Sequence, residues 1–558
     1  YSSAASDVYK RQTLVSELLN IDKDIIEVQT PSNVEFGDFS VPCFAFAKIL
    51  RMSPKDIAQK LVDSFSLPSV DHTVAVNGYF NVFLSKQFLF SQTLNTINTT
   101  TNYGSSHSGE RKTAFIEHTS INPNASPHIG RARNALIGDA ITRLLRFEDY
   151  DVDVHYFVND IGKQIAMLVL ATEGKKDVKF EELLALYVQV YNDLKDHPEF
   201  EQKVFDLLHE LESGNPEVAK KFKHIVDICL KGQVAIFNEL GISYDHFDYE
   251  SDYVVNGRIK EILEDLQRTG NLFEDETGRL VIDQNGYNVP LKNPYLVVTR
   301  QDKTSLYPLR DIAYTIDKVQ SDSHRNIVVL GEDQKTYFLQ ISAALKMLGY
   351  VPPEVVHYAF VLLADGKMST RQGKVVLLEE FMEESLQKVS DSLLSRYGKV
   401  DTEKAKKIAY GSVKYAILKT SSDRNVVFDW ENVLSFEGDS SLYIQYNYAR
   451  IMSMLNKKQP SDNVDFSLLN NPLEYELIKK LTEFKDVVAK SVATLSVNGI
   501  ASYVYSLTKL FGKYYHDCKI IDDATPELTN ARLYLVKAIS KVIKNGLGIL
   551  GIEVLDQI

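Results

Sequence analysis

The chain has 558 residues, a formal net charge of −13 and a hydrophobic fraction of 44%. This length is too great for one hydrophobic core and predicts three or four domains. No run approaches the ~20 apolar residues that a membrane helix needs, so we expect no membrane association. The acidic balance argues against a protein that coats nucleic acid through a bulk positive field.

Three cysteines, Cys43, Cys229 and Cys518, lie far apart and form no Cys-x-x-Cys pair. Neither a zinc ribbon nor a disulfide framework is expected, no residue is assigned as a metal ligand, and a reducing cytoplasm is the predicted location. Charge is uneven along the chain, with a net +2 from Ser441 onward against −15 before it. The C-terminal part could therefore meet phosphate, although random variation of a solvated surface explains such a difference equally well.

The N-terminal region is expected to be a separate α/β module over residues 13–103. The module is expected to start at residue 13 because the first twelve residues lack an initiating Met and are predicted to be foreign to the fold. Helical patterns occupy Leu14–Leu19 and Ile57–Phe65, and alternation predicts a strand over Val74–Leu84. The polar run Thr99–Gly109 is predicted to be a linker.

Residues 111–375 are predicted to form the catalytic part. Apolar runs separated by helical segments are typical of an α/β fold with a Rossmann-like, doubly wound parallel sheet, whose ligand lies beyond the carboxyl ends of the strands. The expected strands are Ala114–Ile116, Leu296–Val298, Ile327–Leu330 and Tyr358–Leu363. An acidic, mostly helical insertion over about 170–292 is expected to separate the two halves of this sheet.

The remainder of the chain is predicted to be helical. A stem over 376–440 contains helices around Phe381–Tyr397 and Lys404–Leu418, and residues 441–558 form an all-helical domain. Asn545-Gly546 is expected to end its last helix. Three apolar stripes at helical spacing predict its core: Leu477, Leu481, Phe484 and Val488; Tyr503, Leu507, Leu510 and Phe511; and Leu535, Ile539, Val542 and Ile543.

The first of two functional segments is Pro127-His128-Ile129-Gly130-Arg131. It follows the apolar run Ala114–Ile116, and helical spacing follows it, which predicts a strand-to-helix turn. The residues that carry this spacing are Ile137, Ile141, Leu144 and Leu145. Such a turn aims backbone N–H groups and the positive end of a helix at phosphate.

The second segment is Lys367-Met368-Ser369-Thr370-Arg371. It follows the turn-forming pair Asp365-Gly366, which places its cationic side chains on a mobile loop able to clamp a polyphosphate. We predict that the first segment cradles one ATP and that the second closes over it.

Together the two segments resemble the HIGH and KMSKS motifs of class I aminoacyl-tRNA synthetases, and the resemblance extends from about Asn33 to Ile558. Further stretches are similar to arginyl-tRNA synthetases: Ile116–Asn124, Tyr156–Gly162, Leu306–Asp311, Leu434–Gly438 and Tyr446–Arg450. The resemblance implies an arginine–tRNA ligase, a monomeric cytoplasmic enzyme of protein biosynthesis. It would use ATP with Mg²⁺ to form arginyl-adenylate from L-arginine and transfer the arginyl group to the 3′ end of tRNA(Arg). In this family arginine activation usually needs bound tRNA.

Forming an adenylate is mostly a problem of placing charge around phosphorus. The resemblance implies catalytic roles for His128, Gly130, Arg131, Lys367, Ser369 and Arg371, with Pro127, Asn134 and Met368 as further ATP-binding residues. Two positions depart from the family pattern. Arg131 stands where most class I enzymes have a second histidine, and Thr370-Arg371 replaces the second lysine of the other motif.

A guanidinium ligand needs planar carboxylate partners and an aromatic or hydrogen-bonding wall. The resemblance implies that Asp311 is the main carboxylate for the guanidinium and that Tyr307 is its wall. Glu117 and Asn122 would hold the α-amino end, His128 would also contact arginine, and Asp333 with Gln334 would complete the pocket.

Contacts with tRNA are implied at both ends of the chain. The N-terminal module resembles the domain that touches the tRNA elbow in this family, and Phe36 is its candidate contact. The C-terminal domain resembles the DALR-type anticodon-binding bundle, in which Tyr443 and Tyr446 offer faces for unstacked bases and Arg450 offers a guanidinium.

Two other functions share these features. Another class I synthetase or a small nucleotidylyltransferase would contain the same ATP loops, so its amino-acid dependence would distinguish it. A non-catalytic tRNA-binding relative is suggested by Arg131, and it would bind tRNA without forming arginyl-tRNA.

Overall fold

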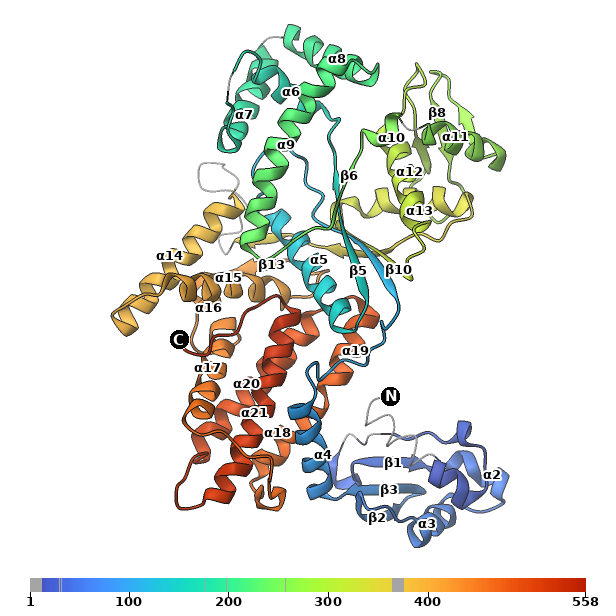
Figure 1. Cartoon of the computed structure of the whole chain (residues 1–558). Helices are drawn as coiled ribbons and strands as arrows, with labels where there is room; N and C mark the ends of the chain where they lie inside the picture. Colours follow the sequence, from blue (N-terminus) through green and yellow to red (C-terminus); the bar gives the residue numbers. More distant parts are fainter. Residues whose placement is uncertain are drawn as a thin grey trace. The chain divides into compact units, whose positions relative to one another are not determined.

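The computed structural model of the chain describes residues 13–29, 31, 33–175, 177–196, 198–255, 257–363 and 376–558 (Figure 1). The predicted loop residues Lys367, Met368, Ser369 and Arg371 lie outside the described residues. Two compact units make up the chain: Tyr1–Ser106, Arg450–Asp486 and Ser506–Asn545 in the first, and His107–Ala449, Val487–Tyr505 and Gly546–Ile558 in the second. Within the described ranges, no helix is both long and apolar enough to span a membrane.

The second unit contains the predicted parallel sheet. Its strand order is β11-β10-β4-β5-β6, and every neighbouring pair is parallel. The strands are β4 (Thr113–Glu117), β5 (Asp151–Val158), β6 (His246–Tyr249), β10 (Arg325–Gly331) and β11 (Glu354–Tyr358). Successive strands run outward from β4 in one direction and then from β10 in the other. The order therefore reverses between β4 and β10, which is where open α/β sheets bind ligands.

Helix α5 (Ile129–Phe147) packs against this sheet at the reversal point, contacting β4, β5 and β10. Its alanines and leucines favour helix, and its close approach to the strands requires Gly138. A Cβ at Gly138 would lie 2.2 Å from the ring of His118, which directly follows β4. Burial lowers the pKa of His118 to about 3, so this packed imidazole is neutral.

Two predicted strands belong to other sheets. Leu296–Val298 overlaps β9 (Tyr295–Val297), which forms an antiparallel sheet with β7 (Leu272–Glu274) and β8 (Leu280–Asp283). The run Tyr358–Leu363 divides between the end of β11 and β12 (Val361–Leu363), which pairs with β13 (Val426–Phe428). These assignments to the parallel sheet were wrong because an apolar run reports burial and does not identify the partner strand.

The range 170–292, predicted as a helical insertion, also contains a strand of the main sheet. Four helices lie together in Figure 1: α6 (Lys163–Ala171), α7 (Phe180–Asp196), α8 (Pro198–Glu212) and α9 (Pro216–Glu239). Their buried side chains form one hydrophobic core. The chain then returns to the parallel sheet as β6, and α10 (Asp252–Val255) and α11 (Arg258–Thr269) follow. Strand β6 was missed because strands were predicted from apolar runs, and β6 contains polar residues.

The helices α12 (Tyr307–Val319) and α13 (Lys335–Met347), with the 3₁₀ turn η4 (Glu332–Gln334), complete the catalytic part. The predicted stem helices are confirmed as α14 (Leu378–Tyr397) and α15 (Thr402–Leu418), and α16 (Trp430–Val433) follows them.

The C-terminal helices are confirmed as well. They are α17 (Ser441–Lys457), α18 (Pro472–Thr482), α19 (Phe484–Thr494), α20 (Asn498–Asp517) and α21 (Pro526–Ile549), with the 3₁₀ turn η5 (Phe466–Leu468). The predicted stop at Asn545-Gly546 was wrong, since α21 continues to Ile549. Leu547 and Ile549 are buried, so tertiary packing overrides the weak helix propensity of the Asn-Gly pair.

The N-terminal module of the first unit has a three-stranded antiparallel sheet in the order β1-β3-β2. The predicted single strand Val74–Leu84 is a hairpin, because Asn77 and Gly78 both have positive φ (50° and 82°) and turn the chain between β2 and β3. The elements are η1 (Lys23–Ile25), η2 (Val34–Phe36), β1 (Phe39–Pro42), η3 (Cys43–Phe46), α2 (Ala47–Leu50), α3 (Pro54–Ser64), β2 (Val70–Val76), β3 (Tyr79–Leu84) and α4 (Lys86–Thr99), after a helix over 13–19.

The predicted linker Thr99–Gly109 includes a packed side chain. Tyr103 is buried, and its hydroxyl donates to the backbone oxygen of Leu481 at 3.2 Å within the first unit. A polar composition does not by itself make a segment loose.

Candidate active site

The predicted strand-to-helix turn is confirmed between β4 and α5. His128 is the N-cap of α5, has extended backbone angles and makes no side-chain capping hydrogen bond. Gly130 is buried and Arg131 is half-buried on the first turn. The first N–H groups of a helix have no intrahelical partner, so this helix end can bind an anion.

The ring of His128 has an open hydrogen-bonding position. Among the residues that the structure describes, its buried Nδ1 has no hydrogen-bond partner. Burial and the positive charge of Arg131 lower the pKa of His128. The imidazole is therefore neutral at physiological pH and can donate or accept a hydrogen bond at the helix end.

The chain that follows the second motif pairs with this turn. The Ile129 N–H donates to the oxygen of Val376 at 3.1 Å, and the Leu378 N–H donates to the oxygen of Pro127 at 2.8 Å. An antiparallel bridge joins His128 and Leu377. Residues 376–378, which come shortly after the second motif in the chain, therefore pair with the first motif.

The chain that precedes the second motif also contacts α5. One guanidinium nitrogen of Arg133, Nη1, donates to the backbone oxygens of Ala359 at 2.6 Å and Arg424 at 2.7 Å, and Nη2 donates to Ser421 at 2.9 Å. Arg133 is fully buried. Segments on both sides of the second motif are therefore held to the first turns of α5.

Asn134, predicted to bind ATP, is occupied by backbone contacts. Its side-chain oxygen accepts from the Thr119 N–H at 2.6 Å, and its side-chain nitrogen donates to Val329 at 2.9 Å. It thereby ties the exit of β4 to β10 at the point where the strand order reverses. Direct contact of this amide with ATP stays a prediction.

The loop after β4 is strained. Thr119 and Ser120 have φ values of 71° and 42°, in the left-handed region that is costly for a β-branched residue. Hydrogen bonds hold this conformation: Thr119 Oγ1 lies 2.9 Å from the Tyr244 hydroxyl, and the Phe157 N–H donates to Ser120 Oγ at 3.1 Å. Strain that its surroundings maintain is concentrated at binding sites, but residue type alone gave no sign of it.

Two predicted arginine-binding carboxylates are electrostatically coupled. Glu117, at the end of β4, is buried and forms an ion pair with Lys318 of α12. Asp311, also on α12, is half-buried and accepts a hydrogen bond from the Tyr337 hydroxyl. Burial raises the pKa of Asp311 to about 6, the Tyr337 hydrogen bond opposes the rise, and the charge of Glu117 adds to it.

The tyrosine that bonds to Asp311 packs beside a second aromatic ring. Tyr307, the first residue of α12, is 54% exposed, and its ring centroid lies 5.3 Å from that of Tyr337. Sequence reasoning missed Tyr337, although it follows Asp333 and Gln334 by one helical turn on α13. Asp333 and Gln334 lie in η4, directly after β10.

Asn122 does not join this group through its side chain. Its Nδ2 donates to Gln164 Oε1 on α6 at 3.1 Å, and the backbone oxygen of Asn122 accepts from Gln233. The predicted contact between Asn122 and the α-amino group stays a prediction.

Comparison with known families distinguishes this chain from other class I synthetases and from small nucleotidylyltransferases. Residues 93–430 match the model described as tRNA synthetases class I (R), catalytic domain. The chain belongs to the class I arginyl-tRNA synthetases. Residues 444–558 match the DALR anticodon binding domain, and residues 10–84 match the arginyl tRNA synthetase N terminal domain.

Relatives of the family cover nearly the whole chain. An arginine–tRNA ligase from Methanocaldococcus jannaschii is 37% identical, with 97% of each chain covered, and one from Methanothrix thermoacetophila is 35% identical, with 91% of each covered. The solved arginyl-tRNA synthetase of Thermus thermophilus superposes with a TM-score of 0.80 at 26% identity, covering 99% of this chain and all of that one. These matches confirm the predicted family and fold.

The predicted anticodon residues lie on α17. Tyr443 and Tyr446 are half-buried in the second unit, where Tyr443 packs edge-on against Tyr505 and Tyr446 packs edge-on against Phe436. Both rings thus have aromatic support within the protein. Their contacts with tRNA stay predictions.

Two further candidates lie in the first unit. The Arg450 guanidinium lies 4.4 Å from the ring centroid of Tyr515, which is 40% exposed. Phe36 in η2 is 47% exposed. Exposed aromatic faces beside a guanidinium suit unstacked bases, and these contacts also stay predictions.

Proposed function

We propose that this chain joins L-arginine to the 3′ end of tRNA(Arg) at the expense of ATP. The observation that carries the proposal is the backbone pairing of Pro127–Ile129 with Val376–Leu378. It supports a single site in which the second motif closes over a nucleotide at the N-terminus of α5. Family membership assigns ATP-dependent ligation of arginine to such a site.

In the first step, an oxygen of the arginine carboxylate attacks the α-phosphorus of ATP. The bond from that phosphorus to the bridging oxygen breaks, pyrophosphate leaves, and arginyl-adenylate forms. Backbone N–H groups of α5 and the His128 ring bind the phosphates, and Lys367 with Arg371 stabilises the charge that develops on pyrophosphate. Mg²⁺ enters as the counter-ion of the ATP substrate. Ser369 donates one further hydrogen bond.

In the second step, a hydroxyl at the tRNA 3′ end attacks the arginyl carbonyl carbon and AMP leaves. Asp311 is the guanidinium partner that we favour, because Glu117 already has a cationic partner in Lys318. Tyr307 and Tyr337 would form the wall beside that carboxylate. For Glu117 to bind the α-amino group, arginine must compete with Lys318.

We further propose that the enzyme acts as a monomer in the cytoplasm. One chain supplies both motifs and both carboxylates, which supports the monomer. The cysteines Cys43, Cys229 and Cys518 are free and buried, which is compatible with a reducing compartment.

The function is tested by charging total tRNA with each of the twenty amino acids in separate reactions. We expect esterification with arginine alone, and pyrophosphate exchange that is weak until tRNA is added. Charging with a different amino acid would reject the proposal. Binding of tRNA without any charging would favour the non-catalytic relative, and activity regained by Arg131→His would locate that loss at the departure from the family pattern.

A further inference from the structure

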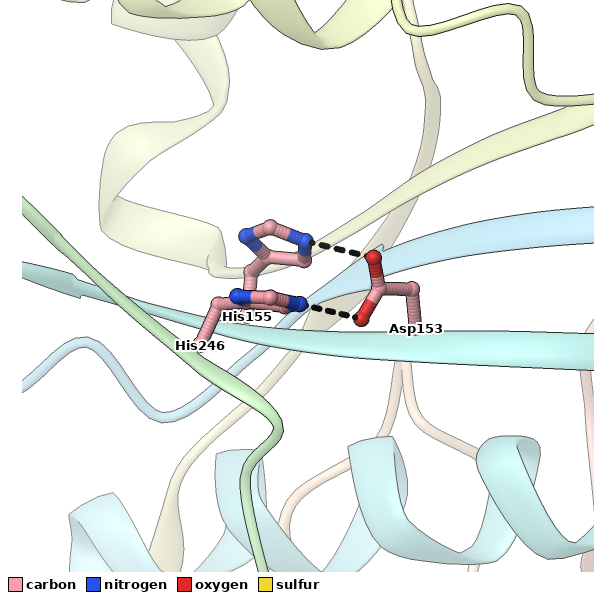
Figure 2. A group of neighbouring side chains, drawn as sticks. All are labelled: Asp153, His155 and His246. Carbon is pink, nitrogen blue, oxygen red and sulfur yellow. Dashed lines mark ion pairs between the residues drawn. The ribbon is translucent and has the colours of Figure 1, made fainter.

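A second group of chemistry-bearing side chains lies on one face of the parallel sheet, at the edge formed by β5 and β6 (Figure 2). Asp153 and His155 are two residues apart on β5, so their side chains leave the same face. The register of the sheet places His246 of β6 directly beside His155. Two neighbouring strands thus bring two imidazoles and one carboxylate together.

The ligand atoms of the three residues lie close together. His155 Nε2 lies 3.3 Å from Asp153 Oδ2, and His246 Nε2 lies 3.0 Å from Asp153 Oδ1. The imidazole rings are stacked with centroids 4.7 Å apart, and one ligand atom from each residue lies within 4.8 Å of the others. Figure 2 shows both rings directing a nitrogen toward the carboxylate.

A carboxylate behind His155 fixes the orientation of its ring. Asp248 Oδ2 lies 2.7 Å from His155 Nδ1 and also accepts from the Tyr314 hydroxyl at 2.7 Å. The ring of Phe115 stacks on the His155 ring, with their centroids 3.8 Å apart. Because Nδ1–H donates to Asp248, the lone pair of a neutral imidazole is on Nε2. Carboxylates hold metal-binding histidines in the same way.

With a neutral imidazole, this arrangement places an acceptor opposite an acceptor. Within the described part of the chain, the buried Nε2 of His155 has no hydrogen-bond partner, although Asp153 lies beside it. A lone pair next to a carboxylate is unfavourable unless a positive charge stands between them. That charge is either a proton or a metal ion.

Exposure and donor chemistry favour a metal ion. The side chain of His155 is 12% exposed, whereas those of Asp153 and His246 are 51% and 55% exposed, so an ion can enter from solvent and retain a water ligand. Two imidazoles with one carboxylate suit Zn²⁺ and its neighbours better than Mg²⁺ or Ca²⁺. Ligand atoms around a tetrahedral Zn²⁺ are about 3.3 Å apart, close to the separations between nitrogen and oxygen observed here.

We propose that the edge of the sheet binds one divalent transition-metal ion of the Zn²⁺ class through His155 Nε2, His246 Nε2 and the Asp153 carboxylate. Because the two imidazole nitrogens face different oxygens of Asp153, binding of one ion by all three residues requires the exposed His246 ring to rotate. The ion joins edge strand β6 to β5 and acts as a structural clamp. None of the three ligands is a residue proposed to contact ATP or arginine, although His155 of β5 pairs in register with Glu117 of β4. The test therefore measures metal binding itself and does not depend on arginylation.

The test uses the full-length protein after treatment with EDTA and removal of the chelator. Zn²⁺ and Co²⁺ are titrated separately, with calorimetry for Zn²⁺ and visible absorption for Co²⁺. We expect one equivalent of each and a tetrahedral Co²⁺ spectrum. His246→Asn and Asp153→Asn should each weaken Zn²⁺ binding at least tenfold, and both positions are exposed enough to keep the fold. Asp248→Asn should weaken it by about tenfold to a hundredfold.

His72→Asn is the matched control. His72 lies 2.7 Å from Asp71 and stacks on Phe83 at 4.2 Å, so it reproduces the carboxylate and the aromatic support of His155. It should leave Zn²⁺ binding unchanged. Equal affinity of the unsubstituted protein and His246→Asn would overturn the proposal. So would a protein that binds no Zn²⁺ and whose His155 is an imidazolium by ¹⁵N chemical shift, because a proton then supplies the positive charge.

Discussion

The first turns of α5 carry two kinds of polar side chain. Some are bonded to the backbone and stabilise the fold, whereas others are available to a ligand. Arg133 and Asn134 are buried and donate to backbone oxygens of neighbouring segments. Of the Arg133 nitrogens, Nη1 and Nη2 make these bonds, and Nε has no partner among the described residues. His128 has a buried nitrogen without a partner among the described residues, and Arg131 is half-buried. Residues of similar chemistry on one helix thus have different tasks, which their hydrogen bonds identify.

The two kinds of side chain differ in the free energy that binding a ligand costs. A buried donor that is already bonded to the backbone cannot turn to a ligand without leaving an unpaired group behind, at a cost of about 1–3 kcal/mol. A group without a partner can meet a ligand without that cost. Substitutions of the first kind should therefore reduce stability, and those of the second kind should reduce activity.

The largest expected effect on stability comes from Arg133→Met. The backbone oxygens of Ala359, Ser421 and Arg424 lose a charged donor, which should cost at least about 3 kcal/mol and lower the thermal unfolding temperature by several degrees. Arg131→Met, the same substitution two positions away, should leave that temperature almost unchanged. Differential scanning calorimetry of both variants gives the answer, and equal losses would break the comparison.

The largest expected effect on activity comes from Lys367→Ala. Loss of a cation that stabilises pyrophosphate should reduce kcat by about a hundredfold to a thousandfold without changing the unfolding temperature. The exposed Lys346→Ala is the control and should keep full activity. An unfolding temperature that falls in parallel with kcat would assign Lys367 to the scaffold.

Asp311→Asn should act mainly on arginine. A charge-assisted hydrogen bond to a guanidinium contributes about 1.5–3 kcal/mol, so the KM for arginine should rise by about tenfold to a hundredfold with less change in the KM for ATP. Asp317→Asn is the control, because this carboxylate lies on the same helix and pairs with Arg258. Equal effects on arginine and ATP would contradict the assignment.

A smaller effect is expected from pH. Because burial raises the pKa of Asp311 to about 6, the carboxylate is ionised above that pH and becomes protonated below it. Arginine binds the ionised form, so its dissociation constant should increase by about tenfold between pH 7.5 and pH 5. The dependence should be much weaker in Asp311→Asn, as measured by calorimetry across this range. An identical dependence in both proteins would assign the titration to another group.

Patterns along the chain predicted what local sequence controls. The turn at His128 and the helices α14, α15 and α20 follow from apolar periodicity, and strands β4 and β10 follow from short apolar runs. The polar β6 escaped that criterion. The Asn77-Gly78 hairpin was missed although its Asn-Gly pair is a strong turn signal.

The site was harder to predict because its features depend on contacts between distant segments. The pairing of Ile129 with Val376 and the hydrogen bonds of Arg133 join positions more than two hundred residues apart in sequence. The partnership of His155 and His246 requires the register of β5 and β6. Tyr337 acquires its significance from Asp311, and neither sequence position points to the other.

A double-mutant cycle between His128 and Lys367 tests the central claim most directly. The rate of arginyl-tRNA formation in a single turnover is measured for His128→Asn, Lys367→Ala and the double variant. If both side chains act on one ATP, the combined loss should be at least tenfold smaller than the product of the single losses, a coupling of about 1.4 kcal/mol. If the loss in the double variant instead equals the product of the two single losses within twofold, the two motifs act independently. That result would contradict a shared nucleotide site.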